Sequence, residues 1–148
     1  MTVDIRPLVP ADVDAVVELW REAGLIRAWN DPREDIRRAR AVWPDLLLVA
    51  EHDGAVVGSV MAGYDGHRGW LYYLASARAG VGRALVAEAE RRLIALGCPK
   101  VMLMVRPDNA GVLGYYDLLG YEREGVLVAG KRLIPDTPPP PRENPRRR

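Results

Sequence analysis

The sequence predicts an α/β (α+β) domain whose central sheet is mixed but mostly antiparallel and is flanked by helices. Two observations carry this prediction. Three strand-like runs between residues 46 and 75 follow one another with only short turns between them, which is typical of an antiparallel meander. A helical pattern over 83–96 then separates the last run from another at 101–105, which indicates a crossover. The full expected order is β-α-α-β-β-β-α-β-α-β-β.

The chain is expected to open with one short strand and two helices. Residues 2–6 alternate apolar and polar side chains, which predicts the strand. Residues 10–23 repeat apolar side chains at helical spacing before a glycine, which predicts the first helix. Asp31 followed by Pro32 combines two signals of a helix start, so the second helix is expected over 32–42.

The strands of the meander are expected at 46–50, 55–64 and 70–75. Asp53-Gly54, between the first two, is a strong hairpin signal because a tight two-residue turn needs positive φ angles. Residues 65–69, Asp-Gly-His-Arg-Gly, form the second turn.

After the meander, two helices that each stop at a glycine alternate with strands. The helices are predicted over 83–96 and 109–119, with the strand at 101–105 between them. Residues 121–123 and 126–133 are expected to close the sheet as a final pair of strands.

The composition describes one domain and a short tail. The 148 residues carry a net charge of +1, and 49% of them are hydrophobic, as in an ordinary globular protein. We expect the domain to span 1–134. Residues 135–148 are rich in proline and arginine, which predicts an extended, disordered tail that is either a bare linker or a docking segment. Because the domain is nearly neutral, no nucleic-acid partner is expected.

The sequence also bears on where the protein is located and on whether it can hold a disulfide or a metal. No apolar run approaches the ~20 residues that a membrane-spanning helix needs, and the N-terminus has no signal-peptide core, so we expect a cytoplasmic protein with no membrane partner. The single cysteine, Cys98, excludes an internal disulfide and a multi-cysteine metal site, and no metal is expected.

The most informative segment is residues 78–84, which lead from a buried strand directly into a helix. Gly80 and Gly82 have no side chains, so backbone N–H groups there can approach an anion closely. The helix N-terminus adds a favourable dipole, and Arg78 and Arg83 can add charge-assisted hydrogen bonds to phosphate. The segment is neither a dinucleotide fingerprint nor a P-loop, and taken alone it is also consistent with an ordinary tight turn.

This segment and a second motif together indicate a protein family. Gly80-Val81-Gly82 matches the acetyl-CoA loop Arg/Gln-x-x-Gly-x-Gly/Ala of the GNAT N-acetyltransferase superfamily, and residues 109–121 approximate that family's second signature. The chain resembles the family over about residues 3–133. Three shorter segments, 29–32, 64–69 and 97–100, resemble its YpeA-like bacterial subgroup.

The resemblance implies the GNAT fold and direct transfer of an acetyl group from acetyl-CoA to a primary amine of a small molecule or peptide. It leaves open whether the protein forms a homodimer. It also implies a set of cofactor-binding residues, which are Leu74, Ala75, Arg78, Ala79, Gly80, Val81, Gly82, Arg83, Ala84, Asn109 and Tyr116.

The resemblance assigns Tyr116 as the acid that protonates the departing thiolate, although a tyrosine on an amphipathic helix can also simply pack. Many family members place a glutamate on the strand equivalent to 70–75, and this chain has none there, so the general base is open. Asp65, His67 or Asp31, acting directly or through water, are the candidates for this role, and Asp65 and His67 are alternatively plain turn residues.

Residues between the first two helices are expected to bind the acceptor. Trp29, Asn30 and Asp31 place an aromatic ring beside a carboxylate, which suits a cationic amine. The alternatives are that Trp29 only packs against the start of the next helix and that Asp31 only caps it.

One departure from the family pattern bears on function. The motif's first Arg/Gln is replaced by Ala77, and the chain before Gly80 is about four residues shorter than the pattern, which is ~13 Å of strand path. This favours, as an alternative function, a non-catalytic acyl-CoA-binding module. An adaptor that works through the tail is a third reading.

Overall fold

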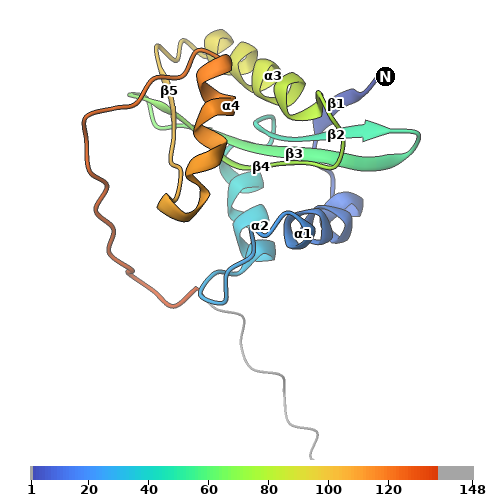
Figure 1. The fold of residues 1–148 in the computed structure, drawn as a ribbon. Helices are drawn as coiled ribbons and strands as arrows, with labels where there is room; N and C mark the ends of the chain where they lie inside the picture. Colours follow the sequence, from blue (N-terminus) through green and yellow to red (C-terminus); the bar gives the residue numbers. More distant parts are fainter. Residues whose placement is uncertain (1, 137–148) are drawn as a thin grey trace, which may run out of the picture.

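The computed structural model describes residues 2–136 (Figure 1). Five strands form one sheet in the order β1-β2-β3-β4-β5. Neighbours are antiparallel except β4 and β5, which are parallel. The elements in chain order are β1 (Asp4–Pro7), the 3-10 turn η1 (Pro10–Asp12), α1 (Val13–Glu22), α2 (Pro32–Val42), β2 (Leu47–His52), β3 (Ala55–Tyr64), β4 (Gly69–Ser76), α3 (Val81–Ala95), β5 (Val101–Leu103), the 3-10 segment η2 (Pro107–Val112) and α4 (Leu113–Leu118).

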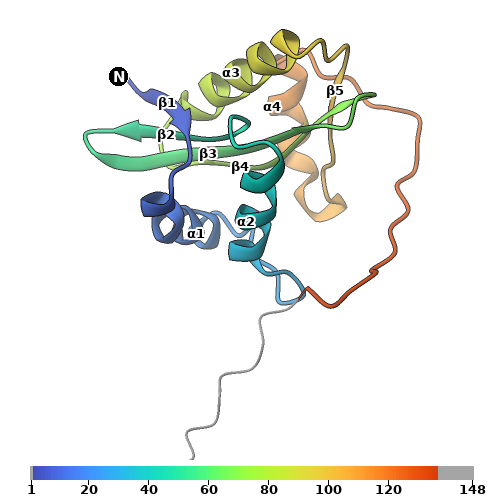
Figure 2. The ribbon, with the colours of Figure 1, turned by 180° about the vertical axis from the view of Figure 1, so that it is seen from behind.

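The sheet separates two hydrophobic clusters. Helices α1 and α2 cover one face, and α3 and α4 lie on the other (Figures 1 and 2). Along β2 and the residue before it, Leu46, Leu48 and Ala50 pack in the α3 cluster, whereas Leu47 and Val49 pack in the α1–α2 cluster. Because both faces are covered, this run is apolar at every position. The fold class predicted from the sequence is confirmed.

Two glycines let α3 lie close to the sheet. A Cβ atom added at Gly58 on β3 would come within 2.6 Å of Val81 Cγ1 and 2.8 Å of Leu85 Cδ1. At Gly69, where β4 begins, it would come within 3.1 Å of Leu93 Cδ1 on α3 and 2.9 Å of Cys98 Sγ just after the helix. The helix therefore crosses β3 and β4 at a distance that a larger residue at either position would not allow.

Ion pairs join the first strand to η1 and to β2. Arg6 on β1 donates to both carboxylate oxygens of Asp12, at 2.7 and 3.0 Å, and to Glu51 at 2.9 Å. The Asp12 side chain is buried and also accepts from the backbone N–H of Val9 at 2.8 Å. Hydrogen bonds from Arg6, more than any other contact, hold the pKa of Asp12 below its usual value.

Strand β4 carries a bulge. Ser59 pairs with Ala75 and Met61 with Tyr72, so β4 has one more residue than β3 between these pairs. Tyr73 lies in the extra stretch and has a φ of 53°, in the left-handed region that favours glycine. Strand β5 pairs only with residues Gly69–Leu71 of β4, so β4 continues beyond its parallel neighbour.

The prediction of a closing pair of strands was wrong. In the described part of the chain, residues 121–123 and 126–133 form no strand, and the strand expected at 101–105 ends at Leu103. An alternating pattern forms a strand only beside a suitable edge, and the three residues of β5 offer a short one. The side chains of Val126, Leu127 and Val128 are instead exposed.

The chain after α4 takes another path. It runs as an extended segment from the top of α4 to the loop before α2 (Figure 1). There Asp136 lies 3.0 Å from the guanidinium of Arg38 on α2 and 3.9 Å from that of Arg132. Of the tail predicted over 135–148, residues 137–148 lie outside the described residues. Among helices within 2–136, none is long and apolar enough to cross a membrane.

Candidate active site

The glycine-rich segment forms a tight turn into α3. The Ser76 hydroxyl donates to the carbonyl of Arg78 at 2.6 Å, and the Ala77 N–H donates to the carbonyl of Val57 at 2.8 Å. Gly80 follows with a φ of 83°, and a Cβ atom there would meet nothing within 4 Å. The helix begins at Val81, two residues before the predicted start, because this buried side chain anchors its first turn in the core.

The first turn of α3 is therefore a concentrated group of N–H donors, and neither Gly80 nor Gly82 adds a side chain of its own there. Gly82 is buried in this turn, and the side chains of Arg78 and Arg83 are exposed beside it. A helix N-terminus bared in this way suits an anion, through both its unpaired N–H groups and its dipole. The predicted binding residues 78–84 are contiguous here, directly after Leu74 and Ala75 at the end of β4.

Tyr115 of α4 reaches this turn. Its hydroxyl oxygen lies 3.0 Å from the position of a Cβ atom built on Gly82, and 3.8 Å separates that position from Ser76 Cβ. The hydroxyl is buried and has no hydrogen-bond partner within residues 2–136. Burial raises the pKa of Tyr115, so the hydroxyl keeps its proton and can act as a donor. Sequence reasoning did not single out this residue.

Tyr116, the predicted acid, lies half-buried between two other tyrosines. Its ring centroid is 5.4 Å from that of Tyr115 and 5.7 Å from that of Tyr121, both edge-on. Tyr121 in turn donates to Glu90 of α3 at 3.0 Å. Burial raises the pKa of Tyr116, which keeps its hydroxyl protonated, as an acid requires. Asn109, in η2, is exposed, and its N–H donates to the carbonyl of Arg106 at 2.9 Å.

The predicted acceptor residues lie on the opposite face of the sheet, in the loop before α2. Asp31 caps α2 by accepting from the N–H groups of Arg33 and Glu34 at 3.0 and 3.3 Å. The Asn30 side-chain amide donates to Asp35 at 2.6 Å and to the Tyr73 hydroxyl at 2.7 Å. Asn30 is thus joined to β4, whereas Asp31 is engaged by the backbone of its own helix.

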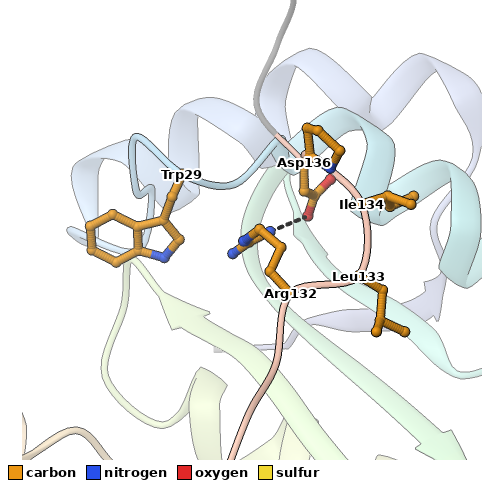
Figure 3. Close-up of a pocket in the computed structure, with 6 residues that line it drawn as sticks. Trp29, Arg132, Leu133, Ile134 and Asp136 are labelled. Carbon is orange, nitrogen blue, oxygen red and sulfur yellow. Dashed lines mark ion pairs between the residues drawn. The ribbon is translucent and has the colours of Figure 1, made fainter.

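Trp29 lies at the edge of a surface cavity of about 390 Å³ (Figure 3). Its ring is half exposed, and the guanidinium of Arg106 lies 5.8 Å from its centroid. The rest of the lining comes from the segment after α4, where the paired side chains of Arg132 and Asp136 stand across from Trp29 (Figure 3). Because those residues were expected in a strand and a tail, the sequence did not predict this cavity.

Asp65 and His67 lie in the hairpin between β3 and β4. One carboxylate oxygen of Asp65 accepts from the N–H groups of His67 and Arg68 at 2.8 and 2.7 Å, and these bonds lower the pKa of Asp65. The eight residues of β4, about 25 Å of strand, separate this hairpin from the turn before α3. The structure does not bring the two together, and the catalytic roles of Asp65 and His67 stay predictions.

No metal site was predicted. Within residues 2–136, no three His, Cys, Asp or Glu side chains gather in a way that could hold a metal ion.

These features define a class of protein. A parallel pair of strands joined by a crossover helix, with a glycine-bared helix N-terminus beyond the longer strand, is typical of α/β proteins that bind a phosphate-containing ligand at strand ends.

Comparison with known proteins gives the family. The sequence profile of the Acetyltransferase (GNAT) family matches residues 13–121. An acetyltransferase of Pectobacterium atrosepticum is 50% identical over 137 residues, covering 90% of this chain and 97% of that relative. Ard1 from Thermoplasma volcanium has the same fold, with a TM-score of 0.73 at 24% identity over 87% of this chain and 86% of that one. PaiA N-acetyltransferase from Thermoplasma acidophilum, in complex with coenzyme A, has a TM-score of 0.69 at 22% identity over 85% and 93%.

The chain belongs to the Acetyltransferase (GNAT) family. The predicted family, the GNAT fold and the enzyme class are confirmed, and the protein is an acetyltransferase. Its place in the YpeA-like subgroup stays a prediction.

Proposed function

We propose that the protein transfers an acetyl group from acetyl-CoA to a primary amine of a small molecule or peptide, by direct attack in a ternary complex. The observation that carries this proposal is the first turn of α3. Gly80 and Gly82 place no side chain of their own over its N–H groups, the Tyr115 hydroxyl lies against Gly82, and the turn follows the strand that extends beyond its parallel neighbour. The diphosphate of coenzyme A fits such a group of donors.

The chemistry makes three demands on the chain. An amine with a pKa of ~10.4 must lose a proton at pH 7, which costs ~4.6 kcal/mol without help from a base or a desolvating pocket. The oxygen of the attacked carbonyl needs donors, which we assign to the backbone at Leu74 and Ala75. The departing sulfur needs a proton, which we assign to the hydroxyl of Tyr116.

The transfer then balances. The base takes one proton from the ammonium group, and the neutral nitrogen then bonds to the acetyl carbon while the carbon–sulfur bond breaks. Tyr116 gives its proton to the sulfur, and the second proton that leaves the nitrogen restores the Tyr116 hydroxyl through solvent. Trp29 and Asn30 are proposed to receive the acceptor, with Asp31 holding the loop that carries them through its cap on α2. Asp65 and His67 remain the candidates for the base, which Asp65→Asn and His67→Ala test separately.

The shortened segment before Gly80 favours a second candidate, a module that binds acyl-CoA without transferring it. Release of free thiol from acetyl-CoA with a panel of amines, together with calorimetry of acetyl-CoA binding, separates the two. We expect heat of binding and thiol release with at least one amine class. Heat without release supports the binding module, and the absence of both contradicts both functions.

Tyr116→Phe sharpens this test. It removes the proton of the acid and keeps the ring, so acetyl-CoA binding should persist while kcat falls by ~10²-fold or more. Tyr72→Phe is the matched control, because that side chain is partly exposed on β4 and its hydroxyl makes no hydrogen bond to another described residue.

A further inference from the structure

We infer that Tyr73 is a positioning residue for the transfer: its side chain holds the β4 bulge and thereby sets the direction of the backbone at Leu74 and Ala75. The inference rests on the proposed function, since it assigns a role within the same site. Neither Tyr73 nor its partner Asp35 is a group that the sequence singles out.

Tyr73 has a backbone conformation that its side chain must compensate. A tyrosine with a φ of 53° has a strained backbone, and such residues persist only when their surroundings hold them. Here the bulge breaks the register of β3 and β4 between the Ser59–Ala75 and Met61–Tyr72 pairs. The two residues that follow Tyr73 are those that we assign as carbonyl donors.

The ring of Tyr73 is fixed by stacking. Its centroid lies 3.7 Å from that of Trp20, with 9° between the planes, and Trp20 is fully buried in α1. Trp20 donates through Nε1 to the Ser59 hydroxyl at 2.7 Å, and that hydroxyl donates to the Tyr73 carbonyl at 2.9 Å. One buried serine therefore joins the stacked indole to the backbone of the bulge.

The far end of the side chain is fixed by α2. The Tyr73 hydroxyl donates to Asp35 Oδ2 at 2.7 Å and accepts from the Asn30 amide at 2.7 Å. The other oxygen of Asp35 accepts from Arg38 at 2.8 Å. Burial, and then Asp35, raise the pKa of Tyr73, so the hydroxyl stays protonated and keeps donating to the carboxylate.

These contacts connect the two sides of the proposed site. Asn30 belongs to the loop that we expect to receive the acceptor, and the bulge borders the stretch of β4 that extends beyond the end of β5. The stacked and doubly hydrogen-bonded side chain of Tyr73 thus fixes the distance between the loop proposed for the acceptor and the strand proposed for the acetyl group. A direct attack between two bound substrates requires such a fixed distance.

Tyr73→Phe tests the inference, because it keeps the stacked ring and removes only the hydroxyl bonds. We expect kcat to fall about 10- to 100-fold, KM for acetyl-CoA to change less than about twofold, and the melting temperature to fall by only a few degrees. Ser59→Ala, which acts on the bulge from the other side, should lower kcat in the same way. Tyr72→Phe is the matched control, since its half-exposed hydroxyl makes no hydrogen bond to another described residue.

The experiment distinguishes failure of the inference from failure of the proposed function. If Tyr73→Phe melts at a lower temperature but turns over as fast as wild type per folded molecule, the residue is only structural and the inference is wrong. If wild type itself releases no thiol with any amine, the proposed function fails, and amide hydrogen exchange then decides the inference. Unchanged exchange at Leu74 and Ala75 in Tyr73→Phe overturns it, whereas faster exchange there and not in α3 supports the hold on the bulge.

Discussion

The hydroxyl of Tyr115 stands directly over Gly82, 3.0 Å from where a Cβ atom would lie, and it has no partner among the described residues. One residue comes from α4 and the other from the first turn of α3. Their contact places a buried donor at the N-terminus that we propose for the coenzyme A diphosphate, and two predictions follow from it.

Gly82→Leu should weaken acetyl-CoA binding about tenfold or more, which corresponds to 1.4 kcal/mol or more. The backbone of Gly82 is helical, so leucine can adopt it, but the larger side chain would press on Tyr115 and cover the N–H groups of the turn. Calorimetry measures the loss. Gly114→Leu on α4 is the control, because no atom of a described residue lies within 4 Å of a Cβ built there. Equal affinities for the two variants would contradict the assignment of this turn.

Tyr115→Phe should leave the protein without ligand as stable as wild type, or more stable by up to ~1 kcal/mol, because it removes a buried hydroxyl that forms no hydrogen bond to any residue of 2–136. Tyr121→Phe makes the same change where the hydroxyl bonds to Glu90, and it should destabilise by ~1 kcal/mol. Urea unfolding of both variants checks the contrast. A clear loss of stability in Tyr115→Phe would show that its hydroxyl has a partner.

Gly58→Ala should destabilise the fold by ~1–3 kcal/mol, because its methyl group would come within 2.6 Å of Val81 Cγ1 and push α3 from the sheet. On the same strand, Trp43, at 4.0 Å, is the only described residue that a Cβ atom at Gly63 would meet, so Gly63→Ala is the matched control. Thermal or urea unfolding compares the two. Similar stabilities would mean that α3 does not rest on β3 as closely as described.

Acid should weaken the fold partly through Asp12. The pKa of Asp12 is lowered in the folded state, chiefly by hydrogen bonds from Arg6, so its stabilising effect is complete above its unfolded pKa of ~3.9 and is lost as the pH falls through the folded value. Glu88, held mainly by Arg91, acts likewise between about 4.5 and its folded pKa of about 2.

Unfolding measured from pH 7 to 2 tests this. Asp12→Asn should be less stable than wild type at pH 7, and the difference should shrink below about pH 4. Glu22→Gln, which removes an exposed carboxylate with no ion pair to a described residue, should follow the wild-type curve. An Asp12→Asn deficit that stays constant down to pH 2 would mean that the ion pair with Arg6 does not stabilise the fold.

Several elements could be predicted because their signals are local. The Asp31-Pro32 pair begins α2, and its predicted bounds of 32–42 match those observed. The Asp53-Gly54 turn leads into a strand that spans 55–64, as predicted. The glycine-rich turn before α3 and the family could also be predicted, because the motifs that indicate them place particular residues within short stretches of the chain.

Other features depend on residues that are distant in the chain. The closing strands failed because their alternating pattern could not reveal that β5 ends at Leu103 and leaves them little edge. Three contacts join separate elements. Tyr73 on β4 stacks on Trp20 of α1 and bonds to Asp35 of α2, and Tyr115 of α4 contacts Gly82 of α3. Local preferences extend over a few residues, whereas the spacing of these side chains is set by how whole elements pack. The sequence therefore identified the enzyme family and the turn that we propose for the cofactor, and only the packed structure brought together the side chains around it.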